Sequence, residues 1–127
     1  MKKTSLHSFH KESGARLVDF AGWEMPISYF SPLKEHEEVR NRAGIFDISH
    51  MSEFMINGKE AKKFVSFISI ADLNRIEAGK SQYSAMLNEK GGIIDDIIVY
   101  CFSDSSFMIC SNAANFDAVY SLSLIHI

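Results

Sequence analysis

Residues 88–100 read NEKGGIIDDIIVY, and this stretch decides the fold. Its first four residues are a turn signal between two runs, 82–87 and 92–102, that are rich in apolar residues, so the pattern predicts an antiparallel hairpin. The second run holds two adjacent carboxylates, Asp95 and Asp96, in its middle. A buried carboxylate must find partners, because an unpaired one is costly or becomes neutral.

The strand geometry separates these two acids. Successive side chains of a strand point to opposite faces, so Asp95 and Asp96 cannot share one pocket, which weakens a glycosidase or aspartic-protease interpretation. With Glu89-Lys90 as a two-residue turn, Asp96 is expected opposite Tyr83 on the same face, whereas a one-residue slip would give Tyr83 to Asp95. A carboxylate beside a phenol suits an aromatic, hydrogen-bonding ligand, and a purely structural hydrogen bond is the alternative.

The rest of the chain mixes helices and strands. Caps and periodicity predict helices at 4–13, 32–43 and 59–69 and from residue 112 onward, strands at 16–20, 45–49, 52–56 and 107–110, and a loop at 21–26. Because hairpins replace regular βαβ units, we predict an α+β fold, with a mixed or antiparallel sheet and flanking helices.

Composition excludes several classes of function. The 127 residues carry a net charge of −3 and no basic block, so neither nucleic acid nor a membrane surface is an expected partner. The sequence shows no signal or transit segment, which favours a bacterial-type cytoplasmic location. Cys101 and Cys110 favour a reduced compartment, with a disulfide as the alternative. Asp47 and His50 lack a third ligand at a recognised spacing, so we expect no metal and a structural polar network there.

The end of the chain is unusual. Residues 1–120 show no internal boundary and are expected to form part of one domain, whereas the apolar stretch 121–127 has no stop signal. We therefore expect 121–127 to be a non-native or truncated tail and the chain to be a fragment.

Several motifs make the chain recognisable. They are GARLVDFAGWEMP at 14–26, EH at 35–36 with VR at 39–40, AGIFDISHM at 43–51, GKSQYSAMLN at 79–88, GGIIDDIIVY at 91–100 and NAAN at 112–115. In this order and spacing they resemble the N-terminal part of the glycine cleavage system T-protein, an aminomethyltransferase, from about residue 3 to about residue 120. Ala71-Asp72 departs from the Asn-Asp that is usual in the family after the third helix.

The resemblance implies an activity and a site. The family moves a one-carbon unit from the aminomethyl-dihydrolipoyl arm of the H-protein to tetrahydrofolate, releasing ammonia and leaving 5,10-methylenetetrahydrofolate, without a metal. Asp96 matches the catalytic aspartate, and Met51, Tyr83 and Asn112 match positions that line the folate site. Each has a structural alternative: Tyr83 could fill the sheet face, Met51 the core, and Asn112 could be a helix N-cap.

Electrostatics fits the implied role of Asp96. One-carbon transfer between nitrogens passes through iminium-like cations, which a fixed carboxylate in a low-dielectric pocket stabilises. Two other functions remain open: a non-catalytic folate-binding protein related to iron–sulfur assembly factors, and the folate domain of a sarcosine or dimethylglycine dehydrogenase. The fragment alone is expected to be inactive.

Overall fold

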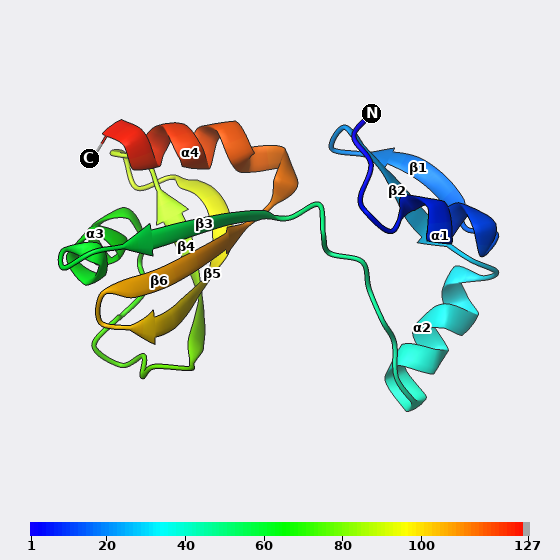
Figure 1. Cartoon of the computed structure of the whole chain (residues 1–127), viewed down its shortest axis with the longest axis horizontal. Coiled ribbons are helices and arrows are strands. Elements are labelled where there is room, and N and C mark those ends of the chain that lie inside the picture. The colour runs from blue at the N-terminus through cyan, green and yellow to red at the C-terminus, as the bar shows by residue number, and fades with distance from the viewer. Residues whose placement is uncertain (126–127) are drawn as a thin grey trace. The chain divides into compact units, whose positions relative to one another are not determined.

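The computed structural model describes residues 1–125 and divides the chain into two compact units, Met1–His50 and Met51–Ile127. Figure 1 shows the order of the elements along the chain. Of the predicted tail, residues 121–125 continue the last helix, and residues 126–127 lie outside the described part.

The first unit contains a helix, a two-stranded sheet and a second helix. Its elements are α1 (His7–Glu12), β1 (Arg16–Phe20), β2 (Trp23–Ser28) and α2 (Pro32–Asn41). The two residues between the strands have positive φ, 52° at Ala21 and 81° at Gly22, which is the conformation of a type I′ hairpin turn. The predicted loop at 21–26 is therefore wrong beyond residue 22. Pro26 argued against a strand, but it lies beside a register shift, where a missing N–H is tolerated.

Residues 45–49 do not form the predicted strand. They have no regular structure, and the side chains of Ile45, Phe46 and Ile48 are exposed. Asp47 accounts for the difference, because its carboxylate accepts hydrogen bonds from its own segment and from the first ten residues of the chain. Such local side-chain bonding competes with a β ladder.

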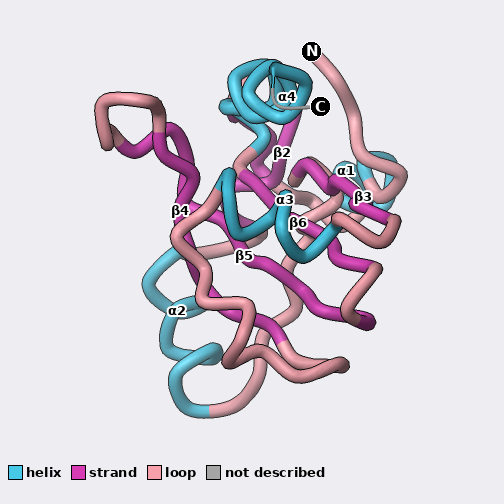
Figure 2. The backbone as a smooth tube through the Cα atoms, turned by 90° about the vertical axis from the view of Figure 1, so that its left-hand side faces the viewer, coloured by secondary structure: helices cyan, strands magenta, loops and turns pink. Residues whose placement is uncertain are grey.

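The second unit is an antiparallel sheet with helices. Figure 2 separates its strands and helices by colour. The elements are β3 (Ser52–Asn57), α3 (Ala61–Ile68), β4 (Ser81–Leu87), β5 (Ile93–Ser103), β6 (Ser106–Ser111), the 3₁₀ turn η1 (Ala113–Asn115) and α4 (Phe116–Ile125). The strands lie in the order β3-β6-β5-β4 and every neighbouring pair is antiparallel. This arrangement confirms the α+β prediction.

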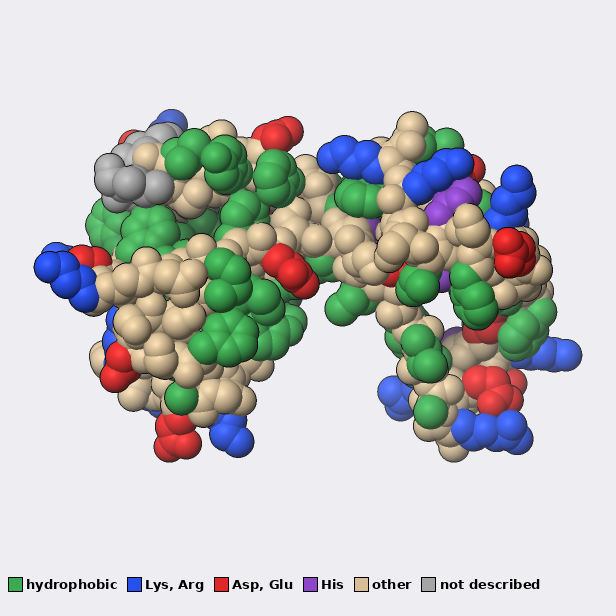
Figure 3. Space-filling view, viewed as in Figure 1, with side chains coloured by type: hydrophobic (Ala, Val, Ile, Leu, Met, Phe, Trp, Pro, Cys, Tyr) green, Lys and Arg blue, Asp and Glu red, His purple; other side chains and the backbone are tan. Residues whose placement is uncertain are grey.

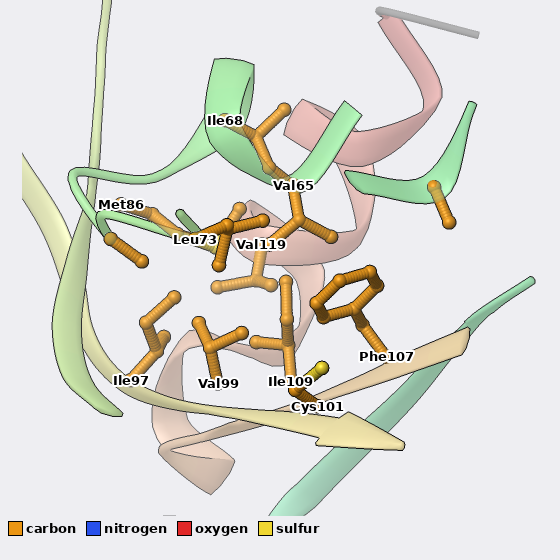
Figure 4. Close-up of a cluster of buried hydrophobic side chains, with 12 residues drawn as sticks. Val65, Ile68, Leu73, Met86, Ile97, Val99, Cys101, Phe107, Ile109 and Val119 are labelled. Atoms are coloured by element: carbon orange, nitrogen blue, oxygen red, sulfur yellow. The ribbon is translucent and has the colours of Figure 1, made fainter. Parts of the chain in front are cut away.

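The core lies on one face of this sheet. Val65 and Ile68 of α3 and Val119 of α4 point toward the buried strand residues Ile97 and Ile109 (Figure 4). The opposite face, called the outer face below, carries the alternate residues of the same strands. The two cysteines are free: Cys101 belongs to the core face, and Cys110 belongs to the outer face.

The β4–β5 hairpin has a different register from the predicted one. Asp96 pairs with Ala85, and Tyr83 pairs with Ile98. The loop is longer than two residues, because Gly91 has φ 78° and donates its N–H to the carbonyl of Asn88 at 2.9 Å. This loop displaces the register by one residue, and the irregularity between Met86 and Leu87 displaces it by one more, so the total displacement at Asp96 is two residues. An even displacement preserves the face, so Tyr83 and Asp96 still project from the same side, as diagonal neighbours.

Candidate functional site

Three of the predicted site residues, Tyr83, Asp96 and Asn112, are in hydrogen-bond contact at one end of the outer face. Ser111 of β6 pairs with both Ile97 of β5 and Ser52 of β3. Continuing this register by one residue places Asn112 between Asp96 on the β5 side and Met51 on the β3 side, so the three residues form one cross-strand row. Residues opposite one another in antiparallel strands project to the same face. Met51 is half-buried, and its role in the site stays a prediction.

Both oxygens of the Asp96 carboxylate are held by neighbouring side chains. The Tyr83 hydroxyl donates to Oδ2 at 2.6 Å, and the Asn112 amide donates to Oδ1 at 3.0 Å. The Tyr83 hydrogen bond lowers the pKa of Asp96, against an opposing effect of desolvation, and the same bond raises the pKa of Tyr83. Asp96 is therefore a fixed anion at neutral pH.

The Asp96 side chain is exposed, not enclosed. Tyr83 beside it is 70% exposed. A cavity of about 1180 Å³ lies elsewhere, between β3, α3 and α4, with Phe54, Phe64 and Tyr120 in its lining. The described residues of the second unit therefore do not by themselves form the expected low-dielectric pocket around Asp96.

Asp95 occupies the core face and is 3% exposed. Its Oδ2 accepts the backbone N–H of Asn112 at 2.8 Å, and its Oδ1 accepts the side-chain amides of Asn112 at 2.9 Å and Asn115 at 2.6 Å. Amide donors of this kind satisfy a buried carboxylate without a cation. Asn112 stands at the N-cap position of η1, but its side chain makes no cap bond there and binds the two aspartates instead.

The outer face next to Asp96 is mostly apolar. The side chains of Ile98, Tyr100, Met108 and Cys110 are half-buried on it, and Met55 is 55% exposed. Figure 3 shows hydrophobic side chains gathered over this sheet. A flat apolar face beside a fixed acid suits an aromatic ring with polar edges. From the sequence, these residues were not assigned to the site. Ile98 and Tyr100 could have been found, because they lie two and four residues after Asp96 on the same strand and so project to the same face.

The first unit contains a separate buried network. Asp47 accepts from the Thr4 hydroxyl at 2.7 Å and contacts His10 Nε2 at 2.8 Å, while Tyr29 Oη lies 2.6 Å from His10 Nδ1. Burial raises the pKa of Asp47, but the hydrogen bonds from His10, Ser49 and Thr4 outweigh it and hold that pKa well below its usual range. The predicted polar network at Asp47 is thus present.

His50 is not Asp47's partner in this network. Its Nδ1 is buried without a hydrogen bond, and its ring packs edge-on against Phe20 at 5.6 Å between centroids. Among residues 1–125, no three His, Cys, Asp or Glu side chains gather in a way that could hold a metal ion. The helices of this described part are all too short or too polar to cross a membrane.

Comparison with known proteins defines the family. Residues 6–125 match the GCVT N-terminal domain, so the chain belongs to that family. It is similar to proteins named aminomethyltransferase: 46% identical over 121 residues in Leptospira biflexa and 47% identical over 121 residues in Corynebacterium jeikeium. These matches cover 94% and 95% of the chain but 33% and 31% of the relatives.

A solved structure gives the same result. The glycine cleavage system aminomethyltransferase T of Bartonella henselae matches with a TM-score of 0.87 and 37% sequence identity. The match covers 98% of this chain and 35% of that protein. The chain thus spans about a third of the length of the relatives that it matches.

Proposed function

We propose that the complete protein is the aminomethyltransferase of a glycine cleavage system. It transfers the one-carbon unit from the aminomethyl-dihydrolipoyl arm of the H-protein to tetrahydrofolate, with release of ammonia, in the cytoplasm. Family membership and the relatives' names support this assignment. The observation that carries it is the Asp96 carboxylate, held by Tyr83 and Asn112 at the edge of an apolar sheet face.

The proposed role of Asp96 is electrostatic. A one-carbon unit that moves between nitrogens develops iminium-like positive charge, and a carboxylate already fixed in place stabilises that charge without reorganising. The hydrogen bonds to both oxygens keep the carboxylate oriented, and the lowered pKa keeps it charged. The apolar outer face would hold the flat ring system of the folate, with Met51 at one end of the row.

The test is Asp96→Asn in the complete protein. This variant keeps the shape but removes the charge, so we expect turnover to fall at least about a hundredfold. The thermal midpoint should fall only slightly, because Asp96 is exposed and its hydrogen bonds contribute little to stability there. Asp104→Asn, which neutralises an exposed acid in the β5–β6 turn, is the control and should retain full activity.

Near-normal turnover in Asp96→Asn would remove this residue from the mechanism. Folate binding by the unsubstituted protein without any aminomethyl transfer would favour the non-catalytic folate-binding alternative instead.

A further inference from the structure

The buried carboxylate of Asp95 accepts three hydrogen bonds. Its three donors come from two asparagines that follow β6, and one of them, Asn112, also reaches Asp96. We propose that Asp95 is a positioning residue for the site: it fixes the Asn112 amide, and through it the Asp96 carboxylate. This inference rests on the proposed function.

The Asn112 amide links two acids that point to opposite faces. Its Nδ2 lies 2.9 Å from Asp95 Oδ1, 3.0 Å from Asp96 Oδ1 and 3.3 Å from the Asp96 carbonyl oxygen. An amide nitrogen has two hydrogens, so one can serve Asp95 while the other is shared by the two Asp96 oxygens. Asp95 thereby anchors the group that holds Asp96.

The anchor also selects one orientation of the amide. A carboxylate only accepts, so Asp95 and Asp96 together require the NH₂ group of Asn112, not its oxygen, to face them. Among residues 1–125, no hydrogen bond to Asn112 Oδ1 is found, so this oxygen remains an acceptor for an N–H of the substrate. The chemistry that this recognises is a nitrogen heterocycle with an N–H edge, as in a reduced pterin.

Asp95 itself is held firmly enough for this task. It is 3% exposed, its other oxygen accepts the Asn112 backbone N–H at 2.8 Å, and Asn115 donates at 2.6 Å without contacting Asp96. Fixing both the backbone and the amide of Asn112 leaves that side chain little freedom. Supporting groups of this kind keep reacting groups within the narrow tolerance that transfer requires.

The test is a double-mutant cycle in the complete protein. Asp95→Asn puts an NH₂ group where Asn112 must donate, and Asn112→Ala removes the link. We expect each variant to lower kcat by about tenfold or more and to weaken tetrahydrofolate binding. Because Asp95 acts through Asn112, the double variant should be within about twofold of Asn112→Ala.

Val99→Ala is the matched control for lost stability. Val99 lies on the same strand and the same face as Asp95, is fully buried and does not contact the site. It should lower the thermal midpoint while kcat stays within about twofold of the unsubstituted protein. If Asp95→Asn behaves like Val99→Ala, or if the effects of Asp95→Asn and Asn112→Ala are additive, the positioning role is overturned.

A second measurement separates this inference from the proposed function. If the unsubstituted protein transfers no aminomethyl group, the function fails, but the exchange rates of the Asn112 side-chain amide protons by NMR still test the anchor. We expect slow exchange in the unsubstituted protein and fast exchange in Asp95→Asn. Equal rates would overturn the anchor whatever the activity.

Discussion

At the residue scale, the hydroxyl of Tyr83 lowers the pKa of Asp96. It donates the shortest hydrogen bond to that carboxylate, and this bond is the main cause of the lowered pKa of Asp96. Tyr83→Phe should therefore raise the Asp96 pKa toward its ordinary value. If the carboxylate is the active form, the acid limb of the kcat/KM profile moves to higher pH, because more of the acid is protonated at a given pH.

The pH profile of the complete protein measures this shift. Tyr120→Phe is the control: it removes a phenol oxygen from α4, where the ring stacks on Phe54 and Phe116, so the acid limb should not move. An unchanged acid limb in Tyr83→Phe would show that the phenol does not tune the carboxylate.

Part of this site could be predicted from sequence. Alternation along the strand separated Asp95 from Asp96 and put Tyr83 on the face of Asp96, and this held although the register was displaced by two residues. The role of Asn112 could not be derived in this way, since its contacts depend on the β5–β6 pairing and on a buried acid from the other face. Pairing between strands is set by the whole sheet, not by local pattern.

At the element scale, Gly91 controls the β4–β5 hairpin. Its φ of 78° lies in the left-handed region, and an added Cβ would meet nothing within 4 Å, so a substitution there is strained by the backbone alone. Gly91→Ala should lower the free energy of unfolding by about 1 kcal/mol. Gly91→Asn should cost less than half of that, because asparagine tolerates this conformation better.

Chemical denaturation of both variants tests this. Equal losses for alanine and asparagine would mean that the turn does not depend on the backbone conformation of residue 91.

The elements show why local patterns failed in the first unit. The stretch 46–49 alternates apolar and polar residues as a strand does, but Asp47 is bound to His10 and Thr4, and its neighbours are left exposed. The strand β2 contains Pro26, a residue that is rare inside strands, and the register shift that accommodates it depends on pairing with β1, which local sequence does not show. Helices with clear caps or periodicity, such as Pro32–Asn41 and Ala61–Ile68, were predicted to within a few residues.

Asp47 also makes the first unit sensitive to acid. Its pKa is held low in the folded state, so its contribution to stability is present above the unfolded pKa of about 4 and is lost as the pH falls toward the folded pKa. Asp47→Asn should lower the free energy of unfolding by about 2 kcal/mol at neutral pH, because it removes charge-assisted hydrogen bonds. This difference should shrink below about pH 4, where Asp47 takes up a proton in the unfolded chain while it stays charged in the folded one.

Unfolding curves between neutral pH and pH 2 measure this difference. Asp72→Asn is the control, because Asp72 makes a similar bond to the N–H two residues later but is exposed and lacks a histidine partner. A difference for Asp47→Asn that does not change with pH would contradict the assignment of the effect to its charge.

At the scale of the whole molecule, one short segment of the chain exposes several large apolar side chains together. Within four residues, Ile45 is 100%, Phe46 68% and Ile48 66% exposed. Contiguous exposed apolar residues favour association. The 127-residue chain on its own should therefore sediment with an average mass above 14.3 kDa that rises with concentration.

Two pairs of substitutions test whether residues 45–48, and not exposed apolar residues elsewhere, cause the association. Ile45→Ser with Ile48→Ser should bring the sedimenting mass down toward that of the monomer, because it breaks the more exposed of two runs of three large apolar side chains within four positions in residues 1–125; the other run is Ile27, Tyr29 and Phe30. Ile93→Ser with Leu124→Ser removes as many exposed apolar side chains, but from two segments that are separate in the sequence, and should change the mass less. A chain that sediments as a monomer at every concentration would show that residues 45–48 are covered in solution, and equal effects of the two pairs would show that total exposed apolar area, not its contiguity, drives association.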